Sequence, residues 1–397
     1  MTDPARLLAA MDTDAIIETL KVWVEQESPS PDADAVNAMM DLVIQEAESV
    51  GLTVSRTPGR DGYGDIVKLE TQPAANGPRL LMLTHADTVH AIGTLETLPF
   101  KRDGDKLYGP GIYDMKGGAY LALQAIKTLK ALGSGPAMPV TIMVMPDEEA
   151  GSPTSKDAIE AEARRAAVTL VVEPAREGGK IVTARKGAAR YYLTATGKPA
   201  HSGSRHQDGA SAIREIAAKT VGLEAMTDYG KGVTVNVGVI EAGTAVNVIP
   251  SRATAEIDIR IPTLELAAEI DARMQALKAE IPGVTLEIKG GLNRPPMERT
   301  AGVSALFDHA HGLAGQIGID LETVPQTGGG SDGNFTAALG VPTLDGLGVD
   351  GAGAHTLDEH LLVSSIAPRC ALLASLIETI TPETVQTLDG ANSEDAP

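Results

Sequence analysis

The chain has 397 residues, of which 43% are hydrophobic and 22% charged, a composition typical of globular proteins. Its net charge of −20 repels nucleic acid and anionic membranes, and its 3% of aromatic residues offers few platforms for stacking bases. No apolar run approaches the roughly 18 residues that cross a bilayer. We therefore expect no membrane partner, and the charge and aromatic content lead us to expect no nucleic-acid partner. The length exceeds that of one ordinary core and predicts two domains.

Two features predict a cytoplasmic location. The N-terminal stretch MTDPARLLAAMDTD lacks the basic segment and following apolar segment of a secretion signal. The single cysteine, Cys370, can form no intrachain disulfide, which fits a reducing compartment. We expect Cys370 to pack inside the last helix rather than to take part in chemistry.

The first part of the chain alternates helix-like and strand-like segments. Residues 140–145 and 168–174 are short, continuous apolar runs rich in β-branched residues, as in parallel strands buried on both faces. This alternation predicts an α/β fold with a mostly parallel sheet covered by helices on both faces. The other expected elements are helices at 13–27, 33–50 (ended by Gly51) and 115–132, and strands at 52–56, 65–70 and 78–87.

The pattern changes near residue 183. Three runs alternate apolar and polar residues, the pattern of half-exposed antiparallel strands. These strands lie at 189–197, 232–243 and 253–261, with helices at about 209–226 and 263–280 between them.

After residue 293 the α/β pattern returns, with helices expected at 302–316 and 363–380 and a strand at 342–348. We therefore predict a domain formed by residues 1–182 and 294–397. An inserted α+β domain, residues 183–293, interrupts it.

Acidic residues and histidines gather where the predicted core strands end. Since residues i and i+2 of a strand share a face, His85 and Asp87 would point the same way. Open α/β sheets hold their ligands at the carboxyl ends of the strands. The residues at such ends, or in the loops that follow, are His85, Asp87, Asp114, Glu148, Glu149, Glu173 and His355.

Carboxylates packed this closely would be strongly destabilising without a cation. Two imidazoles and three or more carboxylates, with no thiolate, suit Zn²⁺, Co²⁺ or Mn²⁺ better than a closed structural zinc site. Five ligands with one bridging carboxylate suit two metal ions about 3.5 Å apart. Each residue alone also has an ordinary structural explanation, and it is the shared position that favours a metal site. Five other histidines show no such placement and are expected on the surface or behind the ligands: His90, His206, His309, His311 and His360.

The motifs THADTV, YGPGIYDMKGG, PDEEAGSPTSKD, VVEPA, GKPAHSG, NVIP, DIR, GGGSDGNF and GLGVDGAGAH together resemble the M20 metallopeptidases, most closely the glutamate carboxypeptidase branch. They occur in the family's order over nearly the whole chain. The resemblance implies that His85 and Glu173 hold one divalent metal ion and that Glu149 and His355 hold the other. Asp114 would bridge the two ions, which the family leads us to expect to be Zn²⁺.

The resemblance also implies catalytic roles. Asp87 would orient His85 and fix its tautomer. Glu148 would be the general base, taking a proton from a water between the metals and delivering it to the leaving amine. The family places a cis peptide after the bridging aspartate, here between Asp114 and Met115.

The inserted domain resembles the family's lid and dimerisation domain, so a homodimer is expected. His201 would reach the partner subunit's active site and stabilise the tetrahedral oxyanion, assisted by Asn247. Arg260 would bind the substrate carboxylate. Further substrate contacts are expected from Arg294, Lys180 and the backbone N–H groups of Gly329 and Gly330.

These roles predict hydrolysis of the amide between an acyl or aminoacyl group and a C-terminal amino acid, with glutamate favoured. One alternative is an N-acyl-amino-acid deacylase of the acetylornithine or succinyl-diaminopimelate type, and another is a catabolic aminohydrolase. A scaffold protein that has lost catalysis would lack Glu148 or several ligands, and none is missing. The segment HSGSRHQDG is more polar and basic than expected after the lid histidine, so Arg205 and His206 are candidate substrate contacts.

Overall fold

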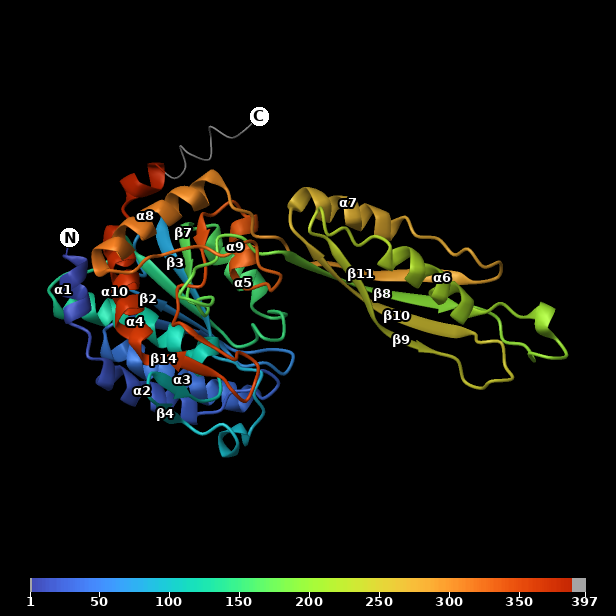
Figure 1. Ribbon diagram of the computed structural model, residues 1–397, viewed down its shortest axis with the longest axis horizontal. Helices are drawn as coiled ribbons and strands as arrows, with labels where there is room; N and C mark the ends of the chain where they lie inside the picture. The colour runs from blue at the N-terminus through green and yellow to red at the C-terminus, as the bar shows by residue number, and fades with distance from the viewer. Residues whose placement is uncertain (1, 388–397) are drawn as a thin grey trace. The chain divides into compact units, whose positions relative to one another are not determined.

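The computed structural model describes residues 2–387, and the chain forms two compact units (Figure 1). Residues 2–184, 299–325 and 331–387 make up the first unit, and residues 185–298 and 326–330 the second. The short segment 326–330 therefore joins the second unit although it lies outside the predicted insertion. The roles of the two units as catalytic domain and lid stay predictions.

The first unit is built on a mixed sheet with the strand order β1-β2-β6-β3-β7-β12. Strand β3 is central and runs parallel to β6 on one side and to β7 on the other, and β12 continues this parallel part. Strands β2 and β1 extend the sheet in antiparallel fashion. The bounds are β1 Thr53–Thr57, β2 Ile66–Glu70, β3 Arg79–His85, β6 Val140–Met145, β7 Ala166–Val171 and β12 Thr343–Leu344.

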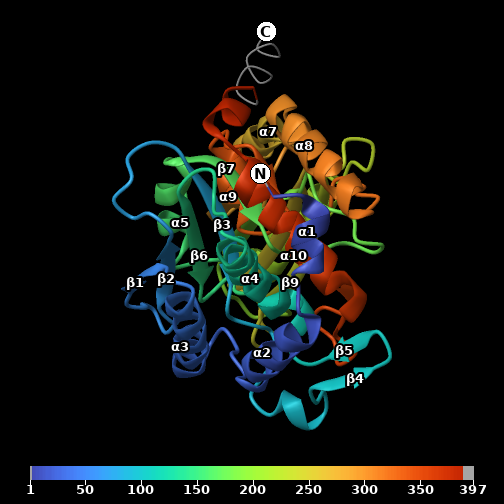
Figure 2. The same ribbon diagram turned by 90° about the vertical axis from the view of Figure 1, so that its left-hand side faces the viewer.

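Helices cover both faces of this sheet, as predicted. Alternate residues of β3 point to opposite faces, so Leu80 and Met82 join one hydrophobic core while Leu81 and Leu83 join another. Figure 2 shows α3, α4 and α10 on one side of the sheet and α5 on the other. The helices of the first unit are α1 Pro4–Ala9, α2 Thr13–Glu25, α3 Ala33–Ser49, α4 Gly117–Ala131, α5 Lys156–Ala163, α8 Ala301–Ile317, α9 Gly333–Ala338 and α10 Val363–Thr379.

Several expected elements of this unit match closely, and others do not. Helix α3 ends before Gly51, whose φ of 79° is the left-handed conformation expected of a terminating glycine. The strand expected at 342–348 is shorter, because only Thr343 and Leu344 pair with β7. A small sheet was not expected at all. Its strands, in the order β13-β14-β5-β4, are β13 Gly351–Ala352, β14 His360–Leu362, β5 Lys106–Tyr108 and β4 Lys101–Asp103.

The second unit is an antiparallel sheet with the strand order β11-β8-β10-β9, packed against two helices. Alternate residues of β8 and β10, such as Tyr191 and Ile257, fill a separate hydrophobic core with Ile216 and Ile270 of the helices. The elements are β8 Gly187–Thr196, α6 Ala212–Glu224, β9 Thr234–Ala242, β10 Arg252–Ile261, α7 Leu264–Gln275 and β11 Thr285–Arg294.

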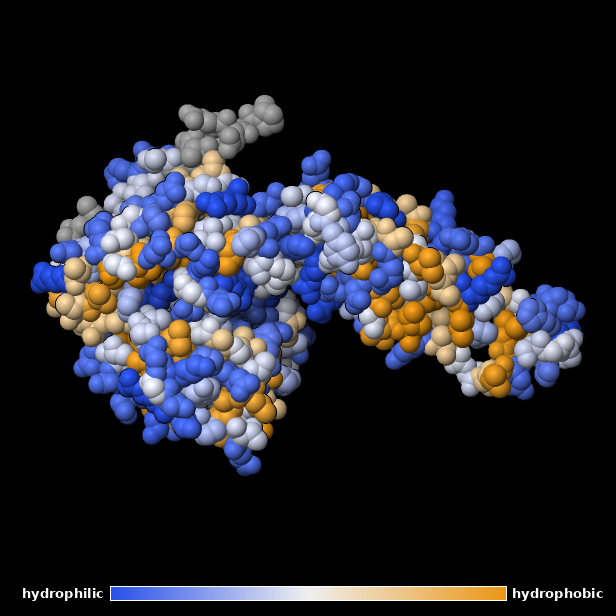
Figure 3. Space-filling view, in the orientation of Figure 1, coloured by the Kyte–Doolittle hydropathy of each residue, from blue (hydrophilic) through white to orange (hydrophobic). Residues whose placement is uncertain are grey.

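Strand β9 forms an edge of this sheet, and most of its residues are exposed on both faces. Val239 and Ile240 are 46% and 50% exposed, and hydrophobic surface lies over the strands of this unit in Figure 3. An exposed edge strand carrying apolar side chains is a template for pairing with another chain.

Within residues 2–387, none of the helices combines the length and the apolar character that a bilayer crossing requires.

Candidate metal centre and substrate-binding residues

The parallel strands of the first unit bring the predicted ligands to one edge of the sheet. His85 is the last residue of β3 and its side chain is 1% exposed. Glu148 and Glu149 follow β6, and Glu173 follows β7. Since β3 lies between β6 and β7 and runs parallel to both, these carboxyl ends meet.

Asp114 lies between the two predicted histidine ligands. Its Oδ1 is 3.5 Å from His85 Nε2, and its Oδ2 is 3.3 Å from His355 Nε2. The two oxygens of one carboxylate thus face different imidazoles. The expected cis peptide between Asp114 and Met115 is present in this segment.

Glu173 and Glu149 each lie close to a different histidine. Glu173 Oε1 is 3.7 Å from His85 Nε2, whereas Glu149 Oε2 is 3.2 Å from His355 Nε2. His355 adopts a φ of 64°, a left-handed conformation that is uncommon outside glycine and is found mainly at functional sites. The pairs His85–Glu173 and His355–Glu149 are the pairs that the resemblance assigns to separate metal ions.

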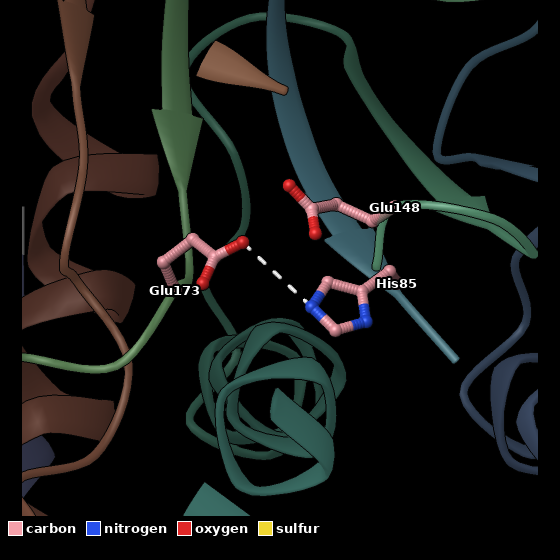
Figure 4. Close-up of side chains that lie close together, drawn as sticks. All are labelled: His85, Glu148 and Glu173. Carbon is pink, nitrogen blue, oxygen red and sulfur yellow. Dashed lines mark ion pairs between the residues drawn. The ribbon is translucent and has the colours of Figure 1, made fainter. Parts of the chain in front are cut away.

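Glu148 lies on the His85 side of the centre. One ligand atom from each of His85, Glu148 and Glu173 lies within 4.8 Å of the others, and Figure 4 shows the three side chains directed toward one another. A second such group consists of His85, Asp114 and Glu149. Although they are adjacent in sequence, Glu148 and Glu149 therefore contribute to different groups.

Asp87 is fully buried and holds the segment that carries both glutamates. Its Oδ1 accepts the backbone N–H of Glu148 at 3.2 Å, and its Oδ2 accepts that of Glu149 at 3.1 Å. His85 Nδ1 lies 2.9 Å from the backbone oxygen of Asp87 and 3.4 Å from Oδ1. Ser30, a residue that the sequence did not single out, donates its hydroxyl to Asp87 Oδ2 at 2.6 Å.

Asp147, which directly precedes Glu148 and Glu149, stabilises the loop rather than facing the centre. Asp147 is fully buried, and its carboxylate accepts the backbone N–H and hydroxyl of Thr154 at 2.6 and 2.7 Å. It also accepts the hydroxyl of Ser155 at 2.5 Å. Asp147 thus closes the loop between β6 and α5, which leaves Glu148 and Glu149 to face the centre.

The close packing of carboxylates and imidazoles shifts the pKa values of several of these groups. Burial raises the pKa of Glu149 to about 7, against the effect of His355, and burial together with the charge of Asp114 raises that of Glu173. Burial alone would raise the pKa of Asp114, but the neighbouring His355 and His85 outweigh burial and hold that pKa well below its usual range. Interaction with Asp114 and Glu149 raises the pKa of His355 to about 10. Like charges at this density favour a bound cation.

The arrangement fits divalent cations. His85 Nε2 and Glu149 Oε1 are buried and have no hydrogen-bond partner within residues 2–387, and both residues belong to one of the groups that could hold a metal ion. Buried polar atoms are rarely left unpaired, and these two belong to the predicted ligands. Two imidazoles with Asp114, Glu149 and Glu173 form an oxygen- and nitrogen-rich donor set that suits Zn²⁺, Co²⁺ or Mn²⁺.

His201 and Asn247 lie side by side in the second unit. The backbone N–H of Ser202 donates to the backbone oxygen of Asn247 at 3.0 Å. His201 Nδ1 accepts the backbone N–H groups of Gly203 and Ser204, each at 3.1 Å. Since Nδ1 is an acceptor, a neutral His201 carries its proton on Nε2, and that exposed N–H is a donor.

The two predicted arginines differ in exposure. Arg260 is 34% exposed and forms a two-point ion pair with Asp258, two residues earlier on β10, with N–O distances of 2.7 and 3.1 Å. Arg294 ends β11 and is only 6% exposed. Any carboxylate that binds Arg260 must therefore share the guanidinium with Asp258.

The remaining predicted substrate residues are placed as follows. Lys180 lies in the first unit and pairs with Glu322 at 2.6 Å, with both side chains exposed. Gly329 and Gly330 belong to the second unit, where the backbone oxygen of Gly329 accepts a hydrogen bond from Arg185 at 3.1 Å. Arg205 forms an ion pair with Asp208 in the same exposed loop as His206.

Residues 81–379 match the family described as Peptidase family M20/M25/M40. The chain is 31% identical to carboxypeptidase G2 of Pseudomonas sp. (strain RS-16) over 373 residues, which cover 91% of this chain and 88% of that protein. The chain belongs to the M20 peptidase family. It is thus a hydrolytic enzyme of the M20 metallopeptidase type.

Other M20 relatives differ in their named activities. The chain is 26% identical to succinyl-diaminopimelate desuccinylase of Rhodospirillum centenum, a match that covers 85% of this chain and 91% of that protein. Among solved structures, the fold is similar to that of aminopeptidase PepT from Bacillus cereus, with a TM-score of 0.75, 20% identity and coverage of 95% and 100%. It is also similar to the Bacillus subtilis YXEP protein, a dinuclear metal binding peptidase of the M20 family, with a TM-score of 0.68, 16% identity and coverage of 95% and 98%. The predicted M20 fold is confirmed.

Proposed function

We propose that this M20 enzyme hydrolyses the amide bond between an acyl or aminoacyl group and a C-terminal glutamate, using two divalent metal ions. The observation that carries the proposal is the position of Asp114, whose two oxygens face His85 and His355 separately. One ion would be held by His85 and Glu173, the other by His355 and Glu149, with Asp114 shared. The dinuclear Bacillus subtilis neighbour and the carboxypeptidase G2 relative support the metal number and the substrate class.

When bound, two such ions would polarise the substrate carbonyl and make a water molecule acidic. We assign Zn²⁺ to the site, and Co²⁺ and Mn²⁺ suit the same donors. Glu148 is the general base: it removes a proton from the attacking water and returns it to the leaving amine. Its backbone is fixed by Asp87, so the carboxylate starts from a defined position.

The second unit supplies most of the groups that would bind substrate, and Lys180 of the first unit adds one. In a homodimer, His201 of a second copy would donate its Nε2–H to the developing oxyanion, with Asn247 beside it. Arg260 binds the carboxylate of the C-terminal residue, and Arg294, Lys180 and the N–H groups of Gly329 and Gly330 complete the substrate contacts. The exposed edge of β9 supports pairing between copies. The buried, unpaired Cys370 fits a cytoplasmic enzyme.

Desuccinylase relatives favour a second candidate, removal of an acyl group from a diamino acid. A catabolic aminohydrolase on this scaffold is a third. The test is amino-acid release from N-acyl-glutamates, N-acyl-aspartates, N-acetylornithine, N-succinyl-diaminopimelate and neutral dipeptides by Zn²⁺-loaded protein. Preferential release of glutamate supports the proposal. Release confined to N-acetylornithine or N-succinyl-diaminopimelate would replace it with the deacylase.

A further inference from the structure

A fully buried carboxylate, that of Glu359, lies behind the segment that carries Asp114. Glu359 follows His355 by four residues and directly precedes β14. Its Oε1 accepts the backbone N–H groups of Tyr113 and Asp114, each at 2.9 Å, and its Oε2 accepts that of Gly111 at 3.0 Å. One side chain therefore holds three backbone groups of a single turn.

The same carboxylate also reaches the segment that follows β3, the strand that ends at His85. Its Oε2 lies 2.5 Å from Nε2 of His90, a residue 8% exposed that follows His85 by five positions. Glu359 thus joins three segments that carry or adjoin a predicted ligand: the chain that follows His85, the turn at 111–114, which contains Asp114, and the loop that follows His355.

Backbone pairing fixes Glu359 itself. In the small sheet, β14 pairs with β5, so that His360 lies opposite Tyr108. The backbone oxygen of Glu359 accepts the N–H of Gly109 at 3.4 Å. Because its backbone is held and both of its oxygens are engaged, the side chain of Glu359 has one favourable orientation.

We propose that Glu359 is a positioning residue of the metal centre, which holds the backbone of residues 111–114 so that the two oxygens of Asp114 stay directed at His85 and His355. The inference rests on the proposed function, since it takes Asp114 as the shared ligand. Glu359 touches no substrate and is not itself a ligand.

The physical reason is the cost of unpaired buried groups. Without the carboxylate, three N–H groups, two of them in buried hydrogen bonds and one in a partly buried one, lose their acceptor, and the turn must shift to recover hydrogen bonds. A shift of the turn moves Asp114, whose oxygens lie within 3.5 Å of both imidazoles. Loss of residues that orient metal ligands weakens metal binding by about 10- to 100-fold.

The test compares Glu359→Gln and Glu359→Asp with Glu215→Gln as a matched control. Glu215 is also fully buried and accepts backbone N–H groups, those of Glu280 and Ile281 at 2.8–3.1 Å, but it lies in the second unit. Gln removes one acceptor oxygen from Glu359, and Asp keeps the charge but shortens the reach. The readouts are the Zn²⁺ dissociation constants, from competition with a chelator, and the Tm of the metal-free proteins.

We expect both Glu359 variants to bind Zn²⁺ about 10- to 100-fold more weakly than the wild type. Glu215→Gln should keep the wild-type affinity while lowering the metal-free Tm as much as Glu359→Gln does. Wild-type affinity in both Glu359 variants would overturn the proposal, as would an equal loss in Glu215→Gln. If Glu359→Asp kept the wild-type Zn²⁺ affinity and only Glu359→Gln lost it, the negative charge of Glu359 would matter rather than the reach of its oxygens. That result would also overturn the proposal. If Glu359→Gln does not fold, Glu359→Asp decides. Because metal binding is measured directly, the result is independent of which substrate the enzyme cleaves.

Discussion

Asp87 accepts the backbone N–H of Glu148, with 3.2 Å between Oδ1 and the nitrogen. The same side chain lies 3.4 Å from Nδ1 of His85. One buried carboxylate therefore fixes a predicted metal ligand and the predicted base together, through contacts that β3 and β6 bring side by side.

Replacing Asp87 by Asn should disturb both groups. An amide offers one acceptor oxygen, whereas the carboxylate serves two backbone N–H groups and the hydroxyl of Ser30. We expect kcat/KM to fall about 10- to 100-fold. Ser30→Ala, which leaves both oxygens of Asp87 in place, is the matched control and should lose much less. Equal kinetics for Asp87→Asn and wild type would rule out this role.

Glu148→Gln separates a base from a ligand, since Glu148 also lies within 4.8 Å of His85 and Glu173. Gln keeps the size but cannot accept a proton, so kcat should fall about 10²- to 10⁴-fold. Two equivalents of metal should remain, as measured by elemental analysis of the protein after gel filtration. Loss of one equivalent would instead make Glu148 a ligand.

Substitution of the histidines should remove the metal ions one at a time. His85→Ala and His355→Ala should each retain one tightly bound equivalent, because each imidazole faces a different oxygen of Asp114. Asp114→Ala should weaken both sites. His206→Ala, on an exposed loop, is the control and should keep two equivalents. Retention of two tight equivalents by His355→Ala would contradict the assignment.

Arg260→Ala tests the substrate carboxylate contact. A hydrogen bond to a charged group contributes about 1.5–3 kcal/mol, so KM for an N-acyl-glutamate should rise about 10- to 100-fold. Arg252→Ala, an exposed arginine on the same strand β10, is the matched control. The assignment fails if both variants have the same KM.

The proposed homodimer should have twice the 41.1 kDa mass of the chain in sedimentation analysis. Ile240→Asp places a charge on the exposed edge strand β9 and should shift the protein toward monomer. Val22→Asp, a similarly exposed residue of α2 (51%), should not. A wild-type protein that sediments as a monomer would refute the dimer.

The sequence predicted the metal ligands best where an acidic residue or histidine directly follows an apolar run that forms a strand. The apolar runs of β3, β6 and β7 predicted buried parallel strands, and the ends of those strands predicted where His85, Glu149 and Glu173 would meet. Asp114 and His355 lie in loops and have no periodic signal, so their position in the chain suggested them only as candidates, and the resemblance supplied their roles as ligands.

Contacts that depend on close backbone approach could not be predicted. Strand β11 was not among the expected strands, and it contains Gly290 and Gly291, residues that usually weaken a strand. In the structure Gly290 packs so closely against β8 that an added Cβ would lie 2.1 Å from the backbone oxygen of Arg190. Glu359 was missed for a related reason, since three of its partners are backbone N–H groups and its motif, HTLDEH, is typical of an exposed polar loop.

The most direct test of the central claim is a titration of metal-free enzyme with Zn²⁺, followed by glutamate release from an N-acyl-glutamate and by direct binding. The account predicts that activity reaches its maximum at two equivalents and that Glu148→Gln binds the same two equivalents without activity. Full activity at one equivalent, or in the continued presence of excess chelator, would contradict a centre in which Asp114 joins two metal ions.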